Sequence, residues 1–159
     1  ETLGGPKAGL SEALDALAAW IASLDTFGTS PFRAIDSDDA RARGRALFED
    51  ATVGCTGCHA APTYTDSAFV GGVPVLHDVG TLGPGSGQRL GGPLEGLDTP
   101  SLRGLWRTAP YLHDGSAATL REVLTTRNPG DAHGVTSHLD DAQIDDMIAF
   151  LRALDDEAP

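Results

Sequence analysis

The stretch Cys55-Thr56-Gly57-Cys58-His59 determines how the rest of this 159-residue sequence is read. Two cysteines three residues apart, followed at once by a histidine, form the pattern of c-type haem attachment, in which both thiols bond the porphyrin and the imidazole reaches its iron. If the segment turns helically, Cys55 and Cys58 lie one turn apart on the same side, and His59 points onto the adjacent porphyrin face. The pattern predicts one covalent haem c, with Cys55 and Cys58 as thioether donors and His59 as an iron ligand.

Two other uses of a C-x-x-C motif are a thiol redox centre and half of a zinc site. The redox centre is expected in a βαβ context, and zinc needs a second Cys/His pair at ligand spacing. The chain has 2 cysteines, and both belong to the motif. Haem attachment consumes both thiols, so no disulfide is expected.

The charge of the chain narrows the class of partner. The sequence has 23 acidic and 11 basic residues and a formal net charge of −12. Nucleic acids and anionic membrane surfaces are poor partners for such a field, whereas a redox protein or haem domain with a basic docking face would be attracted. Plain solubility explains an acidic surface equally well. No apolar run is long enough for a membrane span.

Apolar periodicity and helix-capping residues predict three helices. The first covers about residues 10–25, the second begins near Ser37 and runs through Phe48, and the third follows a cap at Asp140 or Asp141. Residues 26–35 contain glycine and proline and are expected to form a linker. Residues 60–100 are so rich in both that long irregular loops, with little or no β-structure, are expected.

Gly44 and Phe48 in the second helix and Phe150 in the third resemble the helix pair of class I cytochromes c, which cross beside the haem. The sequence therefore predicts an all-α cytochrome c fold for a mono-haem domain over residues 36–159. Residues 11–25 also align with 141–155, setting tryptophan over phenylalanine and repeating the Leu-Asp end. We expect residues 1–35 to hold the last helix of a preceding cytochrome-like domain.

Four further runs carry a more specific likeness: CTGCHAAPTYTD (55–66), LHDVGT (76–81), DTPSLRG (98–104) and TAPYLHDGS (108–116). Together they resemble the C-terminal haem domain of the bacterial di-haem cytochrome c peroxidase and MauG superfamily. The resemblance implies that His59 is the proximal ligand, and that Arg103 pairs a propionate unless it is a surface arginine. It also implies a structural or propionate-side role for His113.

The same resemblance bears on calcium and on the compartment. In the peroxidases, backbone carbonyls of the segment matching Thr108-Ala109-Pro110 bind Ca²⁺ together with a group from a second domain, so Ca²⁺ stays an open expectation. Haem c is attached outside the bacterial cytoplasmic membrane, which implies a periplasmic or extracellular protein.

The distal iron ligand departs from the family pattern. Where the family has methionine or tyrosine, this sequence has Arg127, whose guanidinium cannot ligate iron. We expect His133, in the loop over residues 127–138, to be the ligand. His138, an open or water-bound site, and Met147, which lies within an apolar helix stripe, are the alternatives in that order.

The distal ligand decides the predicted function. Two histidines give a coordinatively saturated electron carrier, methionine raises the potential, and an open position permits peroxide chemistry. The sequence favours one-electron transfer by a domain of a larger multi-haem protein. The alternatives are part of a di-haem cytochrome c peroxidase or MauG-type oxidase, with its peroxidatic haem in another domain, and a five-coordinate sensor.

Overall fold

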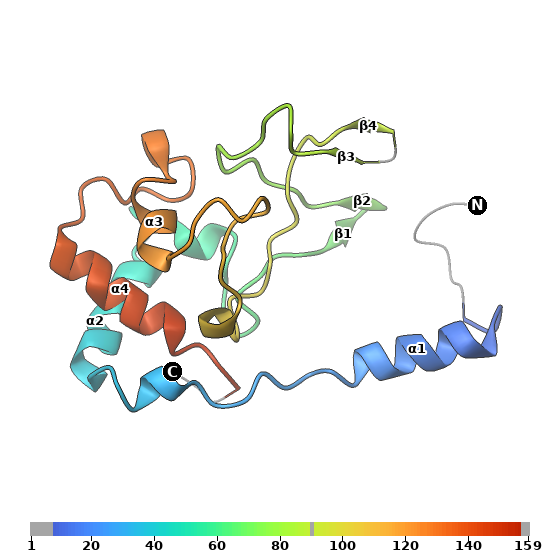
Figure 1. The fold of residues 1–159 in the computed structure, drawn as a ribbon, viewed down its shortest axis with the longest axis horizontal. Coiled ribbons are helices and arrows are strands. Elements are labelled where there is room, and N and C mark those ends of the chain that lie inside the picture. Colours follow the sequence, from blue (N-terminus) through green and yellow to red (C-terminus); the bar gives the residue numbers. More distant parts are fainter. Residues whose placement is uncertain (1–7, 90, 157–159) are drawn as a thin grey trace.

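The computed structural model describes residues 8–89 and 91–156. Over these residues the regular secondary structure is mostly helical, with a few strands of two residues each, and long irregular loops connect these elements (Figure 1). The α-helices are α1 (Glu12–Ala22), α2 (Asp38–Glu49), α3 (Leu120–Leu124) and α4 (Asp141–Arg152). The strands form two antiparallel hairpins, β1 (Phe69–Val70) with β2 (Val73–Pro74), and β3 (Gln88–Arg89) with β4 (Gly92–Pro93). The predicted scarcity of β-structure is confirmed over this part of the chain.

Polar caps set the starts of the predicted helices. The side chains of Ser11 and Ser37 accept hydrogen bonds from the backbone three residues ahead, at the starts of α1 and α2. Asp140 caps α4 in a capping box with Gln143. Each cap satisfies a backbone N–H that has no partner within the helix. These three boundaries agree with the sequence-based expectation.

Helices α2 and α4 pack closely at Gly44. A Cβ atom at that position would lie 1.9 Å from the carbonyl oxygen of Asp146, so only glycine allows the two backbones to approach this far. One turn along, the rings of Phe48 and Phe150 have centroids 5.2 Å apart. The ring of Tyr64 packs on both, with centroids 6.0 Å from Phe48 and 6.4 Å from Phe150. This aromatic cluster is the centre of the core.

The expected linker at residues 26–35 is tied to the C-terminal end of α4. Asp155, whose side chain is fully buried, accepts hydrogen bonds from the Ser30 backbone and from the Arg33 guanidinium, all at 2.8 Å. Arg152 pairs with Asp36 on the same side. These contacts attach the segment before α2 to the C-terminal end of α4.

Helix α1 lies apart from the other helices (Figure 1). None of its residues is buried, and Trp20 is 59% exposed. The aligned residue in α4, Phe150, is 1% exposed. The same apolar face is therefore covered in α4 and uncovered in α1.

Candidate haem site

A cavity of about 520 Å³ adjoins the C-x-x-C-H motif. This volume falls within the range of about 300–1,000 Å³ that is usual for cofactor sites. The wall combines both cysteines and several histidines with apolar side chains from the loop after residue 96, from α3 and from α4. The apolar lining includes Val79, Leu97, Leu102, Leu105, Leu112, Val123, Leu124 and Leu151.

The motif itself forms a short helical turn, as its spacing predicts. Gly54 enters the turn with φ +84°, and residues Cys55–Gly57 form one 3₁₀ turn. The His59 N–H then donates to the Cys55 carbonyl at 2.9 Å, which continues the turn. Cys55, Cys58 and His59 all line the cavity. Burial raises the pKa of the Cys55 thiol to about 11.

The His59 imidazole is oriented by a backbone carbonyl. Its Nδ1 lies 3.0 Å from the Tyr64 carbonyl oxygen, so Nδ1 carries the proton and Nε2 keeps its lone pair. Burial lowers the pKa of His59, against the opposing effect of the Tyr64 hydrogen bond. A neutral imidazole held in this way is the form that binds a metal.

His133 faces His59 across the same cavity. The two ring centroids are 6.4 Å apart and the ring planes are inclined by 45°. A metal–imidazole bond is about 2 Å long and a ring centroid lies about 1 Å from its nitrogen, so imidazoles on opposite sides of one metal have centroids roughly 6 Å apart. His133 Nδ1 is buried and has no hydrogen-bond partner among the described residues. Burial, and then the neighbouring His59, lower the pKa of His133.

These residues fit a haem. The cavity has a suitable volume and an apolar wall, two thiols stand at its edge, and two neutral imidazoles are spaced for one metal between them. His59 and His133 both line this cavity, so each side chain stands where it could ligate a metal held between them.

Comparison with known proteins agrees with this chemistry. A family model described as RoxA-like, cytochrome c-like matches residues 96–130. The chain is 35% identical to hydrazine synthase subunit gamma of Kuenenia stuttgartiensis over 89% of its length, and 30% identical to the methylamine utilization protein MauG of Methylophilus methylotrophus over 85%. A solved structure of the Kuenenia hydrazine synthase matches 89% of this chain and 55% of its own, with a TM-score of 0.65 at 31% identity.

A MauG-like protein associated with microbial copper homeostasis matches 75% of the chain and 44% of its own, with a TM-score of 0.56 at 26% identity. The chain belongs to the MauG and di-haem peroxidase-like cytochrome c family. Membership in this MauG-like family implies haem c and a haem-based redox role. The chain spans about half the length of these relatives, 48% of hydrazine synthase gamma and 42% of MauG.

The other candidate distal ligands of this MauG-like chain differ in their access to the cavity. Met147 is fully buried and lines the cavity, while it also belongs to the apolar core. His138 is exposed and is absent from the lining, as is Arg127 at the position of the family's usual ligand. Of the two loop histidines, only His133 lies on the cavity wall.

The predicted propionate-side residues have other partners. Arg103 donates to the Asp155 carbonyl and to the Asp156 carboxylate, at 3.1 and 2.6 Å, and is not part of the lining. Its role as a propionate partner stays a prediction that these contacts do not support. His113 lines the cavity and is exposed, and its ring nitrogens lie within 3.3 Å of Thr81 and Ser86 hydroxyls.

Sequence reasoning missed a polar cluster beside Cys58. His77 Nε2 lies 2.7 Å from the Asp66 carboxylate, and ligand atoms of Cys58, Asp66 and His77 lie within 4.8 Å of one another. Both polar residues belong to the family-like runs at 55–66 and 76–81, which is the signal that could have paired them. Because Cys58 is the expected thioether donor, the cluster belongs to the haem site.

The described helices include none long and apolar enough to cross a membrane.

Proposed function

We propose that the chain is an electron-transfer domain in which one haem c is bonded to Cys55 and Cys58 and held between His59 and His133. The observation that carries the proposal is the 6.4 Å separation of the two imidazoles across a cofactor-sized cavity. When bound, the haem supplies one-electron exchange between its two iron oxidation states. In this arrangement α2 and α4 cross beside the haem, as in the class I cytochromes c.

The protein would hold such a haem from both sides, through His59 and His133. Tyr64 fixes the tautomer and orientation of His59 through its carbonyl, and the aromatic cluster fixes Tyr64. His133 occupies the side from which a peroxide or another small molecule would have to approach. With both sides taken by strong ligands, the site favours transfer of electrons over reaction with substrate.

Replacing His133 by alanine tests the coordination. We expect the ferric wild-type protein to be low-spin and its reduced form to resist carbon monoxide, and we expect His133→Ala to be high-spin and to bind carbon monoxide. His138→Ala is the matched control, since it removes an exposed histidine of the same loop and should leave the spectra unchanged. A His133→Ala protein that stays fully low-spin would contradict the assignment of His133 as the second ligand.

A second candidate function is catalytic: one part of a di-haem peroxidase or MauG-type oxidase whose substrate reacts at a haem in another domain. The names of relatives favour it, since they include MauG and the cytochrome-c peroxidase IdrP1 of Denitromonas iodatirespirans. The uncovered apolar face of α1, with Trp20 in the place of Phe150, supports α1 as the last helix of such a domain. Intact mass and haem content of the natively expressed protein test this, and a product beginning at Glu1 with one haem would contradict it.

The cellular setting follows from the same chemistry. We infer a location outside the bacterial cytoplasmic membrane, where haem c is attached, and a redox partner whose docking face is basic. The net charge of −12 supports this kind of partner. Electron exchange with a basic cytochrome should slow as ionic strength rises, and a rate that does not depend on salt would argue against electrostatic docking.

A further inference from the structure

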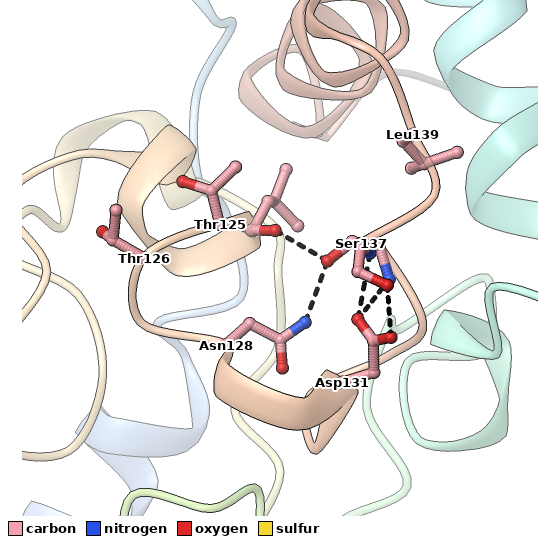
Figure 2. A pocket seen from close by; sticks show the side chains of 8 residues that line it. Thr125, Thr126, Asn128, Asp131, Ser137 and Leu139 are labelled. Carbon is pink, nitrogen blue, oxygen red and sulfur yellow. Dashed lines mark hydrogen bonds between the residues drawn. The ribbon is translucent and has the colours of Figure 1, made fainter.

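A buried carboxamide, that of Asn128 (Figure 2), hydrogen-bonds to the loop that carries His133. The Asn128 Oδ1 accepts a hydrogen bond from the His133 N–H at 2.7 Å, and its Nδ2 donates to the Gly134 carbonyl at 2.8 Å and to the Thr136 hydroxyl at 2.9 Å. These bonds use its acceptor and both donors. The orientation of the amide is fixed, because the reverse one would oppose donor to donor at His133 and acceptor to acceptor at Gly134.

The Thr136 hydroxyl connects this carboxamide to the backbone of α3. Thr136 is 3% exposed, and its hydroxyl accepts from Asn128 and donates to the Leu124 carbonyl at 2.6 Å (Figure 2). Leu124 is the last residue of α3 and also lines the haem cavity. Through Thr136, the carboxamide of Asn128 is therefore hydrogen-bonded to the end of α3, which forms part of the cavity wall.

The other side of the loop is fixed to the chain just before the haem motif. The Val135 N–H donates to the Val53 carbonyl at 2.9 Å. Gly134 has φ +82°, and a Cβ there would lie 3.2 Å from that same carbonyl oxygen. The backbone on either side of Gly134 is thus held between Asn128 and Val53, and the side chain of His133 projects from this clamped segment into the cavity.

We propose that Asn128 is the positioning residue for the distal side of the haem: its carboxamide clamps the backbone at His133 and Gly134 and so holds the His133 imidazole opposite His59. The inference rests on the proposed ligand role of His133 and deepens it. Without the clamp, the loop opens more often and the distal position becomes accessible to small ligands. A buried network that served stability alone would not change that access in the folded protein.

Carbon monoxide association with the reduced holoprotein measures the open fraction of the loop. Asn128→Ala removes all three bonds, and Asn128→Asp keeps an acceptor for the His133 N–H but loses both donors. Two lost backbone hydrogen bonds shift an open–closed equilibrium by roughly tenfold, so we expect association to be about ten times faster in Asn128→Ala. Thr126→Ala is the control, since Thr126 lines the small pocket of Figure 2 together with Asn128 but is exposed, and its side chain has no hydrogen bond among the described residues.

Four results distinguish the clamp from the alternatives. Faster carbon monoxide binding in the Asn128 variants, with the control unchanged, supports the clamp. Variants that lose thermal stability but keep wild-type binding rates and ferric EPR spectra overturn it. If His133→Ala turns high-spin while the Asn128 variants behave as wild type, this inference alone fails. If His133→Ala stays low-spin, the proposed coordination itself is wrong.

A measurement on the wild-type holoprotein covers the case in which neither variant folds. The His133 amide should exchange its hydrogen slowly, because Asn128 accepts it in a buried network. Exchange as fast as that of an open-loop amide would refute the clamp.

Discussion

Replacing Gly44 by alanine should destabilise the protein, although alanine is the better helix former. A Cβ at Gly44 would lie 1.9 Å from the Asp146 carbonyl oxygen and 3.0 Å from the Met147 Cα, and all the atoms it meets are backbone. The first contact is roughly 1.5 Å short of an ordinary van der Waals distance. No side chain can swing aside, so α2 and α4 must separate.

The size of the effect follows from two opposing terms. Overpacking of a core typically costs about 1–3 kcal/mol, and a clash between two backbones belongs at the upper end. The gain in helix propensity from glycine to alanine returns about 1 kcal/mol. We therefore expect a net loss of about 2 kcal/mol in the free energy of unfolding, which corresponds to about 4–8 °C in Tm for a chain of this length.

Urea unfolding of the holoprotein, followed by circular dichroism, measures the change. Ala46→Gly is the matched control, because Ala46 is exposed in the same helix and should lose about 1 kcal/mol through propensity alone. If propensity ruled both sites, Gly44→Ala would be the more stable protein. A Gly44→Ala variant as stable as wild type, or more stable, would refute the close helix contact.

Three further outcomes follow from the contacts described. Asp155→Asn should cost about 3 kcal/mol in urea unfolding, because it breaks a pair whose carboxylate is fully buried, and a loss below 1 kcal/mol would show that the pair is dispensable. Burial raises the pKa of both Tyr64 and Tyr111, so the unfolded chain loses these phenolic protons at a lower pH than the folded chain does. Stability should therefore be intact below about pH 10 and fall as the pH rises above it. A urea midpoint that stays constant from about pH 8 to 11 would contradict this. Cys58→Ala should retain haem after acid–acetone extraction through the Cys55 thioether, whereas a variant lacking both cysteines should release it.

Local patterns predicted the elements that depend on near neighbours in the chain. The haem motif turns helically because its spacing matches one turn, and Ser37 and Asp140 cap helices because their side chains reach backbone three residues ahead. The approach of α2 to α4 was also readable, since Gly44 inside a helix is unfavourable unless another backbone passes there. For the motif and the caps the physical cause lies within a few residues, whereas Gly44 meets the backbone of Asp146 in a distant helix.

Other features depend on contacts that sequence spacing does not reveal. His133 reaches the cavity because Val135, two residues later, hydrogen-bonds to Val53, which lies 82 residues earlier in the chain (135 − 53). The loop sequence alone does not show that this histidine, and not His138, lines the cavity. Helix α3 was not predicted, because its five residues are too few to show an apolar periodicity. The capping box of Thr119 and Glu122 is the sequence signal that could have identified it.

The groups that orient the two histidines of the haem cavity differ in whether a substitution can remove them. His59 is oriented by the main-chain carbonyl of Tyr64, an acceptor that every amino acid carries, so no single codon change at that position deletes it. His133 depends on a side-chain amide, which one substitution removes. With His133 as the proposed ligand, side-chain substitutions in the distal loop should therefore alter the electronic properties of the iron more readily than substitutions at Tyr64 do.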